Sequence, residues 1–153
     1  MTSVPVPIAR SIIRATTSYL GIWHPAAEEL LLMIMAWESK MGTYDHQVGG
    51  PALGWWQMEP TTWNDTDLRA IQRRPYWRQQ LAQLSGNQQE PKEMVTNPAY
   101  ACAMARLKLW LVPQALPDKE DILALSMYAK VHWNTVRGSA VPNDYAMAYR
   151  EAK

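Results

Sequence analysis

Eight consecutive apolar residues, from Leu30 to Trp37 (LLLMIMAW), constrain the fold of this 153-residue chain more than any other stretch. They follow His24-Pro25, and proline suits the first position of a helix because its missing N–H is not needed there. A helix over residues 26–41, ended by Gly42, would be apolar on every side. Such a helix is stable only when other elements surround it, so the sequence predicts a central, buried helix.

The rest of the sequence predicts further helices, each bounded by proline, glycine or a capping side chain. They are expected over residues 7–20, 61 or 62 to 72, 75–84, 98–112, 118–133 (capped by Asp118) and 143–153, with loops at 43–60 and 85–95. No segment alternates apolar and polar residues for long enough to form a long strand. The predicted architecture is a mainly α single domain over residues 1–153, with at most one small β-hairpin within 43–60.

Charge and cysteine content exclude several classes of protein. The net charge of +1 gives no basic field for nucleic acid, so no nucleic-acid partner is expected. A single cysteine, Cys102, excludes an intramolecular disulfide framework, and no apolar run approaches the ~18 residues of a membrane span. The first residues, MTSVPVPIARSII, lack the pattern of a signal peptide, so synthesis in a cytoplasm without such a signal is expected.

The aromatic residues are unusual, with eight Trp, seven Tyr and no Phe. Trp and Tyr offer a flat apolar face and a hydrogen-bonding edge, which suits stacking on sugars or on wet interfaces. The alternative is that most of these Trp side chains belong to the core.

Glu38 is the carboxylate at the end of the apolar helix. Burial and the partial negative charge of a helix C-terminus both disfavour its ionised form, so the position predicts a carboxyl group that stays protonated near neutral pH. Such a group can act as the general acid that cleaves a glycosidic bond. The alternative is that the helix simply reaches the surface there and that Glu38 is solvated.

A glycine-rich turn follows this helix. Gly49, Gly50 and Gly54 let the backbone fold back tightly, which would bring the amide of Gln57 towards the helix end. Glu38-Ser39 followed by GWWQMEPTT (residues 54–62) resembles the signature of the lytic transglycosylases and goose-type lysozymes. In that family a Glu-Ser pair ends a buried helix, and a turn containing Gln lines the sugar cleft.

Two later segments continue the resemblance, which covers about residues 26–138. NPAYACAMARLKLW (97–110) is similar to the family's helix beneath the cleft, and LALSMYAKVHWNTVRG (123–138) is similar to the segment that supplies a Tyr over the catalytic Glu. The family's Asn after this Tyr is missing, because Tyr128 is followed by Ala129, and Lys130 or Asn134 would have to replace it. The last segment also looks like lysozyme-like proteins encoded by tailed bacteriophages.

The resemblance implies a lysozyme-like fold that cleaves peptidoglycan between N-acetylmuramic acid and N-acetylglucosamine, with Glu38 as acid and then base. A lytic transglycosylase closes an anhydro ring on the muramoyl 6-hydroxyl, whereas a hydrolase outcome would need a second acid to position water, for which Glu59 and Asp45 are candidates. The implied substrate-binding residues are Ser39, Gln57, Tyr128, Glu59 and Trp55.

Each substrate-binding residue has a structural alternative. Ser39 could bond back to the helix backbone, Tyr128 could be a core aromatic, and Glu59 could be a surface residue without direct chemistry. Trp55 and Trp56 replace the family's Leu-Met pair, and one of them is expected in the core. The rival function is a structural protein of the virion that keeps this fold with weak or no activity, and a third possibility is a wall-binding module.

No metal or cofactor is expected. Asp45-His46, His24 and His132 fit no zinc spacing, and Cys102 reads as a small buried hydrophobe without an activating histidine. The expected partners are peptidoglycan strands and other virion proteins, with the protein made in the bacterial host and acting at the cell wall. A basic cluster either forms a solvated face or attracts anions of the wall; it consists of Arg69, Arg73, Arg74 and Arg78.

Overall fold

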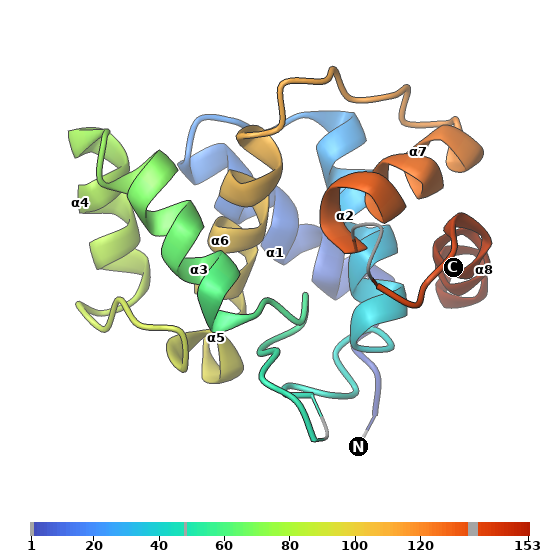
Figure 1. Ribbon diagram of the computed structural model, residues 1–153, viewed down its shortest axis with the longest axis horizontal. Coiled ribbons are helices and arrows are strands. Elements are labelled where there is room, and N and C mark those ends of the chain that lie inside the picture. Colours follow the sequence, from blue (N-terminus) through green and yellow to red (C-terminus); the bar gives the residue numbers. More distant parts are fainter. Residues whose placement is uncertain (1, 48, 135–137) are drawn as a thin grey trace.

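Helix α2 (Pro25–Glu38) passes through the middle of the molecule, and other helices pack around it (Figure 1). The computed structural model describes residues 2–47, 49–134 and 138–153. Leu30, Leu31, Met33, Ile34 and Met35 are completely buried. They are covered by contacts of α2 with α1, α6, α7 and α8. The predicted central helix is therefore confirmed.

The described residues form one mainly helical domain, as predicted. Residues 43–59 make two isolated β-bridges, His46 with Leu53 and Leu53 with Met58, and the described part of the chain contains no regular strand. None of its helices is long and apolar enough to cross a membrane. The other helical elements are α1 (Val6–Tyr19), α3 (Pro60–Thr66), the π-helix η1 (Asp67–Ile71), α4 (Pro75–Leu84), α5 (Glu93–Thr96), α6 (Pro98–Trp110), α7 (Ile122–Ala129), the π-helix η2 (Lys130–Asn134) and α8 (Pro142–Ala152).

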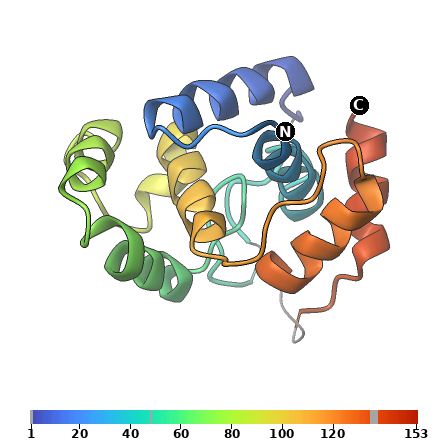
Figure 2. The same cartoon turned by 90° about the horizontal axis from the view of Figure 1, so that it is seen from above.

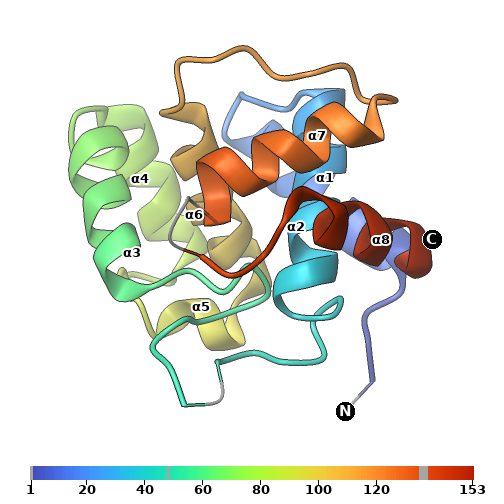
Figure 3. The same cartoon turned by 45° about the vertical axis from the view of Figure 1, so that its right-hand side comes forward.

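The helices fall into two groups on either side of α2 and α6. Helices α3, α4 and α5 lie on one side, and α7 and α8 lie on the other (Figures 1 and 2). The segment that follows α2 crosses from the end of that helix to the start of α3, as Figure 3 shows. The C-terminal end of α2, this segment and η2 therefore come together at one end of the central helix pair.

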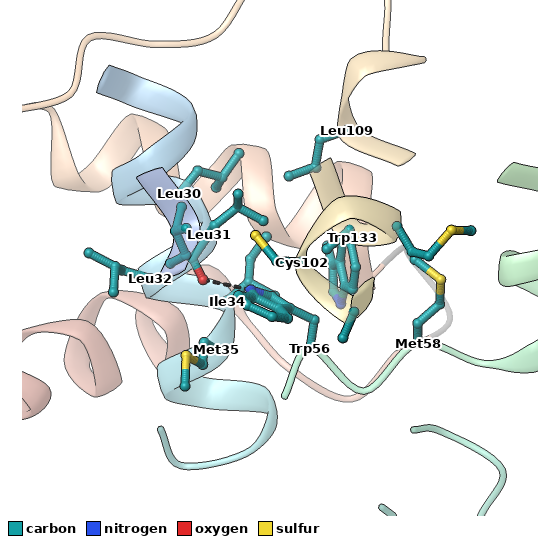
Figure 4. Packing of buried hydrophobic residues seen from close by; sticks show 14 of the residues in the cluster. Leu30, Leu31, Leu32, Ile34, Met35, Trp56, Met58, Cys102, Leu109 and Trp133 are labelled. Carbon is teal, nitrogen blue, oxygen red and sulfur yellow. Dashed lines mark hydrogen bonds between the residues drawn. The ribbon is translucent and has the colours of Figure 1, made fainter. Parts of the chain in front are cut away.

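Trp56 fixes the crossing segment to the central helix. Its indole Nε1 donates a hydrogen bond of 2.9 Å to the carbonyl of Leu31, and its ring packs in the core with Ile34 and Cys102 nearby (Figure 4). Trp56 is 1% exposed, so it is the core member of the Trp55-Trp56 pair. A buried indole that satisfies its N–H in this way ties the loop to one position on the helix.

The central helix ends earlier than the sequence predicts, at Glu38 rather than Met41. Lys40 and Met41 take left-handed backbone angles, with φ of 49° and 55°, which end the helix. The Ser39 hydroxyl lies between the carbonyl of Met35 (3.2 Å) and the N–H of Gly42 (2.9 Å). These bonds satisfy groups that a helix end leaves unpaired, so the polypeptide turns three residues before the glycine.

Other boundaries also differ. The predicted helix 118–133 begins at Ile122, because the carboxylate of Asp121 accepts from the N–H of Ala124 (3.0 Å), whereas Asp118 caps a preceding turn. A short helix, α5, lies where the sequence predicts only a loop. Residues 135–137 of the predicted segment 123–138 lie outside the described residues.

Candidate active site

Glu38 lines a cavity of about 630 Å³, here called the central cleft. The cleft is lined by the end of α2, by Lys108 of α6, by η2 with Ser139 beyond it, and by residues of the turn after α2 and of α3. The residues of this last group are Gln47, Ala52, Gln57, Met58, Glu59, Thr61, Thr62 and Asp65. Trp37 and Trp133 supply aromatic surface, and Gln57 and Asn134 supply amides. An open cavity of this size with aromatic faces and amides suits a sugar chain better than a small apolar ligand.

The carboxyl group of Glu38 is largely withdrawn from water. Its Oε2 atom is buried, and none of the described residues donates a hydrogen bond to it. Burial raises the pKa of Glu38 to about 7, against the opposing effects of the Lys108 charge and the Tyr145 hydroxyl. Such a carboxyl group is substantially protonated near neutral pH and belongs to a side chain that lines a cavity, which is what proton transfer to a substrate oxygen requires.

The turn after α2 brings Gln57 to the cleft, as the sequence predicts. Gly54 has φ of +79°, and its N–H donates to the carbonyl of Asp45 at 2.6 Å. Gln57 has φ of 52°, and its side-chain Nε2 donates to the Gly54 carbonyl at 2.8 Å. The hydrogen bond to Gly54 therefore fixes the position of the Gln57 amide on the wall of the cleft.

Lys108 is a cleft residue that the sequence analysis did not single out. Its Nζ donates to the carbonyl of Trp133 at 3.2 Å and lies 4.1 Å from the centre of the Trp133 ring. Burial lowers the pKa of Lys108 to about 8, although the nearby charges of Glu38 and Glu59 raise it. The signal in the sequence was its place among apolar residues, because a lysine between Leu107 and Leu109 on a buried helix has to reach solvent or a cavity.

Tyr145 of α8, rather than Tyr128, is the tyrosine beside Glu38. The Tyr128 hydroxyl donates to the carbonyl of Gln114 at 3.0 Å, and the Tyr128 ring packs at a tilt of 56° against the His132 ring, with centroids 4.4 Å apart. The Tyr145 hydroxyl is buried near Glu38, and its ring packs edge-on against Trp37. Tyr145 lies beyond the segment that carries the family resemblance, so no motif pointed to it.

The predicted residues Ser39 and Trp55 do not line the cleft. Ser39 is completely buried in the turn after α2, where it makes the backbone bonds that were its structural alternative. Trp55 is half-buried and packs against Gly42. Both residues therefore support the turn, and their predicted contact with substrate has no counterpart in the geometry of the cleft.

Two other carboxylates line the cleft, Glu59 at the start of α3 and Asp65 within it. Both are exposed, and Asp65 pairs with Arg69 at 3.1 Å. Asp45, the other candidate for a second acid, instead pairs with His46 at 2.6 Å on the surface of the turn. The cleft thus has one buried acid and two solvated carboxylates. Among the described residues, no three His, Cys, Asp or Glu side chains are grouped as metal ligands.

Asn134 lines the cleft and is a candidate for the amide that the family places after its tyrosine. Its Oδ1 accepts a hydrogen bond of 2.7 Å from Lys130, whose Nζ also donates to the carbonyl of Gly138 at 2.9 Å. Lys130 does not line the cleft itself. Its hydrogen bond to Oδ1 holds the Asn134 amide in place. The π-helical turn η2 presents His132, Trp133 and Asn134 to the cleft together, and such turns are frequent at functional sites.

Comparisons of the chain with protein-family models, with curated proteins and with solved structures found no significant match. The basis for a function is therefore the chemistry of the central cleft, together with the sequence pattern that surrounds Glu38.

Proposed function

We propose that this protein cleaves the glycan strands of peptidoglycan and that Glu38 is its general acid and base. The observation that carries the proposal is the largely buried carboxyl group of Glu38, with its raised pKa, in a side chain that lines a cleft with aromatic faces. The protonated carboxyl group gives its proton to the glycosidic oxygen, and the bond from that oxygen to the sugar C1 breaks. The oxygen of an incoming hydroxyl group forms the new bond to C1, and Glu38, now ionised, takes the proton of that hydroxyl group.

The incoming hydroxyl group distinguishes two enzymes. In a lytic transglycosylase it is the 6-hydroxyl of the muramoyl residue, and Glu38 alone is sufficient. In a lysozyme it is water, which needs a second carboxylate to orient it. Glu59 and Asp65 also line the cleft, but both are exposed to solvent. Among the described residues of the cleft, Glu38 is the largely buried acid, and one such acid favours the transglycosylase.

The proposed setting is a tailed bacteriophage, because residues 123–138 resemble phage-encoded lysozyme-like proteins. The protein would be made in the host cytoplasm and would act at the cell wall, either carried in the virion or released at lysis. Its partners would be peptidoglycan and, in the first case, other virion proteins.

Purified protein added to murein sacculi tests the proposal. The wild type should clear the suspension, and Glu38→Gln should reduce the rate at least about a hundredfold, since general acid catalysis contributes that much. Glu120→Gln, which removes an exposed carboxylate before α7, should leave the rate unchanged. Anhydromuramoyl ends in the products indicate a transglycosylase, and reducing ends indicate a lysozyme. Murein left intact by folded wild type contradicts the proposal.

A structural virion protein that keeps this fold is the second candidate. A row of apolar side chains on the outer face of α7 and η2 favours it, because Leu123, Met127 and Val131 are 64%, 59% and 57% exposed at helical spacing. Exposed apolar rows of this kind are typical of protein contacts. This candidate predicts no murein cleavage and stable association with another virion protein.

A further inference from the structure

Lys108 brings a positive charge into the central cleft, and the proposed reaction gives this charge no role. Its neighbours on α6, Leu107 and Leu109, are buried in the core. The lysine side chain leaves this core and ends in the cleft that Glu38 also lines. An ammonium group taken out of bulk water in this way is costly unless it has a partner or a purpose.

Trp133 holds the ammonium group in place. The carbonyl of Trp133 accepts one N–H bond from Nζ at 3.2 Å, and the face of its ring lies 4.1 Å from the same atom. An ammonium group has three N–H donors, so this arrangement fixes its position without using all of them. Contact with both a carbonyl and a π face localises the positive charge on the wall of the cleft.

Several charged or titratable groups surround this charge. Glu38 faces it from α2, Glu59 from the residue before α3, and His132 from η2. Tyr145 of α8 and Asp65 of α3 complete the titratable groups around the cleft. Within the described residues that line the cleft, Lys108 is the one amine. Glu38 and Lys108 line the same cleft, so the carboxyl group lies in the field of the ammonium charge that Trp133 holds there.

We propose that Lys108 is a positioning residue for Glu38: its ammonium group, held by Trp133, supplies the positive charge that stabilises the carboxylate left after Glu38 gives up its proton. The proposal rests on the proposed function, because it assumes that Glu38 is the acid. Proton transfer leaves a negative charge on a group that is buried, and without compensation this charge is unfavourable. A fixed cation nearby lowers the free energy of the ionised form and so favours transfer to the glycosidic oxygen.

The test is a titration of the Glu38 side chain by carbon-13 NMR, in the free protein. Lys108→Met should raise the pKa of Glu38 by about 0.5–1 unit, because the opposite charge is lost. Lys108→Arg keeps the charge and should leave this pKa within about 0.3 unit. Lys40→Met is the matched control: it removes the same charge two residues from Glu38, but on an exposed side chain outside the cleft. Solvent screens that charge, so the shift should be below about 0.2 unit.

A second titration does not depend on the folding of Lys108→Met. If two groups interact, each must shift the other's pKa by the same amount, because the interaction is reciprocal. Glu38→Gln should therefore lower the pKa of Lys108 by the same amount, about 0.5–1 unit. This titration is followed at the ε carbon of Lys108. Unchanged titration of Glu38 in folded Lys108→Met, or of Lys108 in Glu38→Gln, overturns the proposal.

The rate of murein cleavage separates this proposal from the proposed function. Lys108→Met should cleave about three- to tenfold more slowly than wild type at pH 5, with its alkaline limb moved to higher pH, because Glu38 has become a weaker acid. Reciprocal pKa shifts without any murein cleavage by wild type would uphold the interaction and overturn the enzymatic function. Murein cleavage by wild type without these pKa shifts would uphold the enzymatic function and overturn the interaction between Lys108 and Glu38.

Discussion

Burial and charge act in opposite directions on Glu38. Removal from water favours the protonated carboxyl group, and the Lys108 charge favours the carboxylate. Burial is the larger effect, so the pKa lies near 7 rather than at the ordinary 4.5. The group is thus able both to give and to take a proton near neutral pH, which is the property that a one-carboxylate glycosidase needs.

This shift predicts a pH dependence of stability. Between about pH 4.5 and pH 7 the folded protein holds the Glu38 proton more tightly than the unfolded chain does, so wild-type stability falls as pH rises through this window. Glu38→Gln has no such loss. Its free energy of unfolding relative to wild type should therefore increase by about 2 kcal/mol from pH 4.5 to pH 7.5. Urea denaturation at both pH values measures this change.

Glu120→Gln is the control for this measurement, because the same chemical change is made on an exposed side chain. Its difference from wild type should be the same at both pH values. If the difference in free energy of unfolding between Glu38→Gln and wild type is also the same at both pH values, folding does not raise the pKa of Glu38.

The site residues that could be predicted are those close together in the sequence. Glu38, Gln57 and Glu59 belong to one helix-turn segment, and all three line the cleft. Lys108 and Tyr145 come from α6 and α8, and their approach to Glu38 depends on how distant helices pack, which a local pattern does not encode. Tyr128 was selected by its motif, yet its hydroxyl bonds to the Gln114 carbonyl instead.

At the scale of elements, the turn from Gly54 to Glu59 determines the shape of the cleft. It is held by Trp56 in the core and by the close approach of Gly54 to α5. A β-carbon on Gly54 would lie 2.8 Å from the backbone carbonyl of Met94, which cannot move like a flexible side chain. Glycine is thus required there for space as well as for its left-handed backbone angle.

Gly54→Ala should therefore destabilise the protein more than Gly21→Ala. Gly21 has almost the same backbone angle, φ of +78°, but no atom lies within 4 Å of the added carbon. Gly21→Ala should cost about 1 kcal/mol for the backbone angle alone. Gly54→Ala should cost about 2 kcal/mol more, because the carbonyl must also be displaced. Equal losses in thermal or urea unfolding would show that the contact with Met94 carries no energy.

Element boundaries were less predictable than element positions. The central helix was expected to continue to Met41 because a glycine, Gly42, ends the predicted helix. The Ser39 hydroxyl, which bonds to the carbonyl of Met35 and to the N–H of Gly42, closes that end. In the same way Asp121 rather than Asp118 caps α7. Several capping side chains are near each helix end, and packing decides which one is used.

At the scale of the whole molecule, an ion network around the buried Glu28 and its neighbour Glu29 joins the first helices to the last. Glu28 of α2 is 2% exposed and accepts hydrogen bonds from Arg10 (2.6 Å) and Arg14 (2.8 Å) of α1. Glu29 pairs with Arg10 and accepts from the Tyr149 hydroxyl of α8. Helices α1 and α8, from the two ends of the sequence, are therefore both bonded to the central helix, at residues that do not line the cleft.

Glu28→Gln should destabilise the protein at neutral pH by about 2 kcal/mol, because the buried carboxylate loses its charge-assisted hydrogen bonds from the partly exposed Arg10 and the exposed Arg14. Burial raises the pKa of Glu28, but hydrogen bonds from Arg14, Trp23 and Arg10 outweigh it and hold the pKa at about 2. The stabilisation is thus present above about pH 4.5 and is lost as pH falls towards 2. The difference between variant and wild type should shrink over that range in urea denaturation.

Glu90→Gln is the matched control, since Glu90 pairs with Lys92 at 3.3 Å on the surface. Its effect should stay below about 0.5 kcal/mol at neutral pH, as for other solvated pairs. If the two variants unfold alike, the network around Glu28 does not hold α1 against α2.

The measurement that tests the central claim most directly is digestion of glycan strands stripped of their peptides, followed by mass spectrometry. With no peptide bonds present, any new fragment must come from cleavage between sugars. Wild-type protein should release short, peptide-free saccharides with anhydromuramoyl ends. Glu38→Gln should release none, and its thermal unfolding shows whether the variant is folded. Strands that stay intact with folded wild type, or that Glu38→Gln cleaves as fast as wild type, would contradict the assignment of Glu38 as the acid of a glycan-cleaving enzyme.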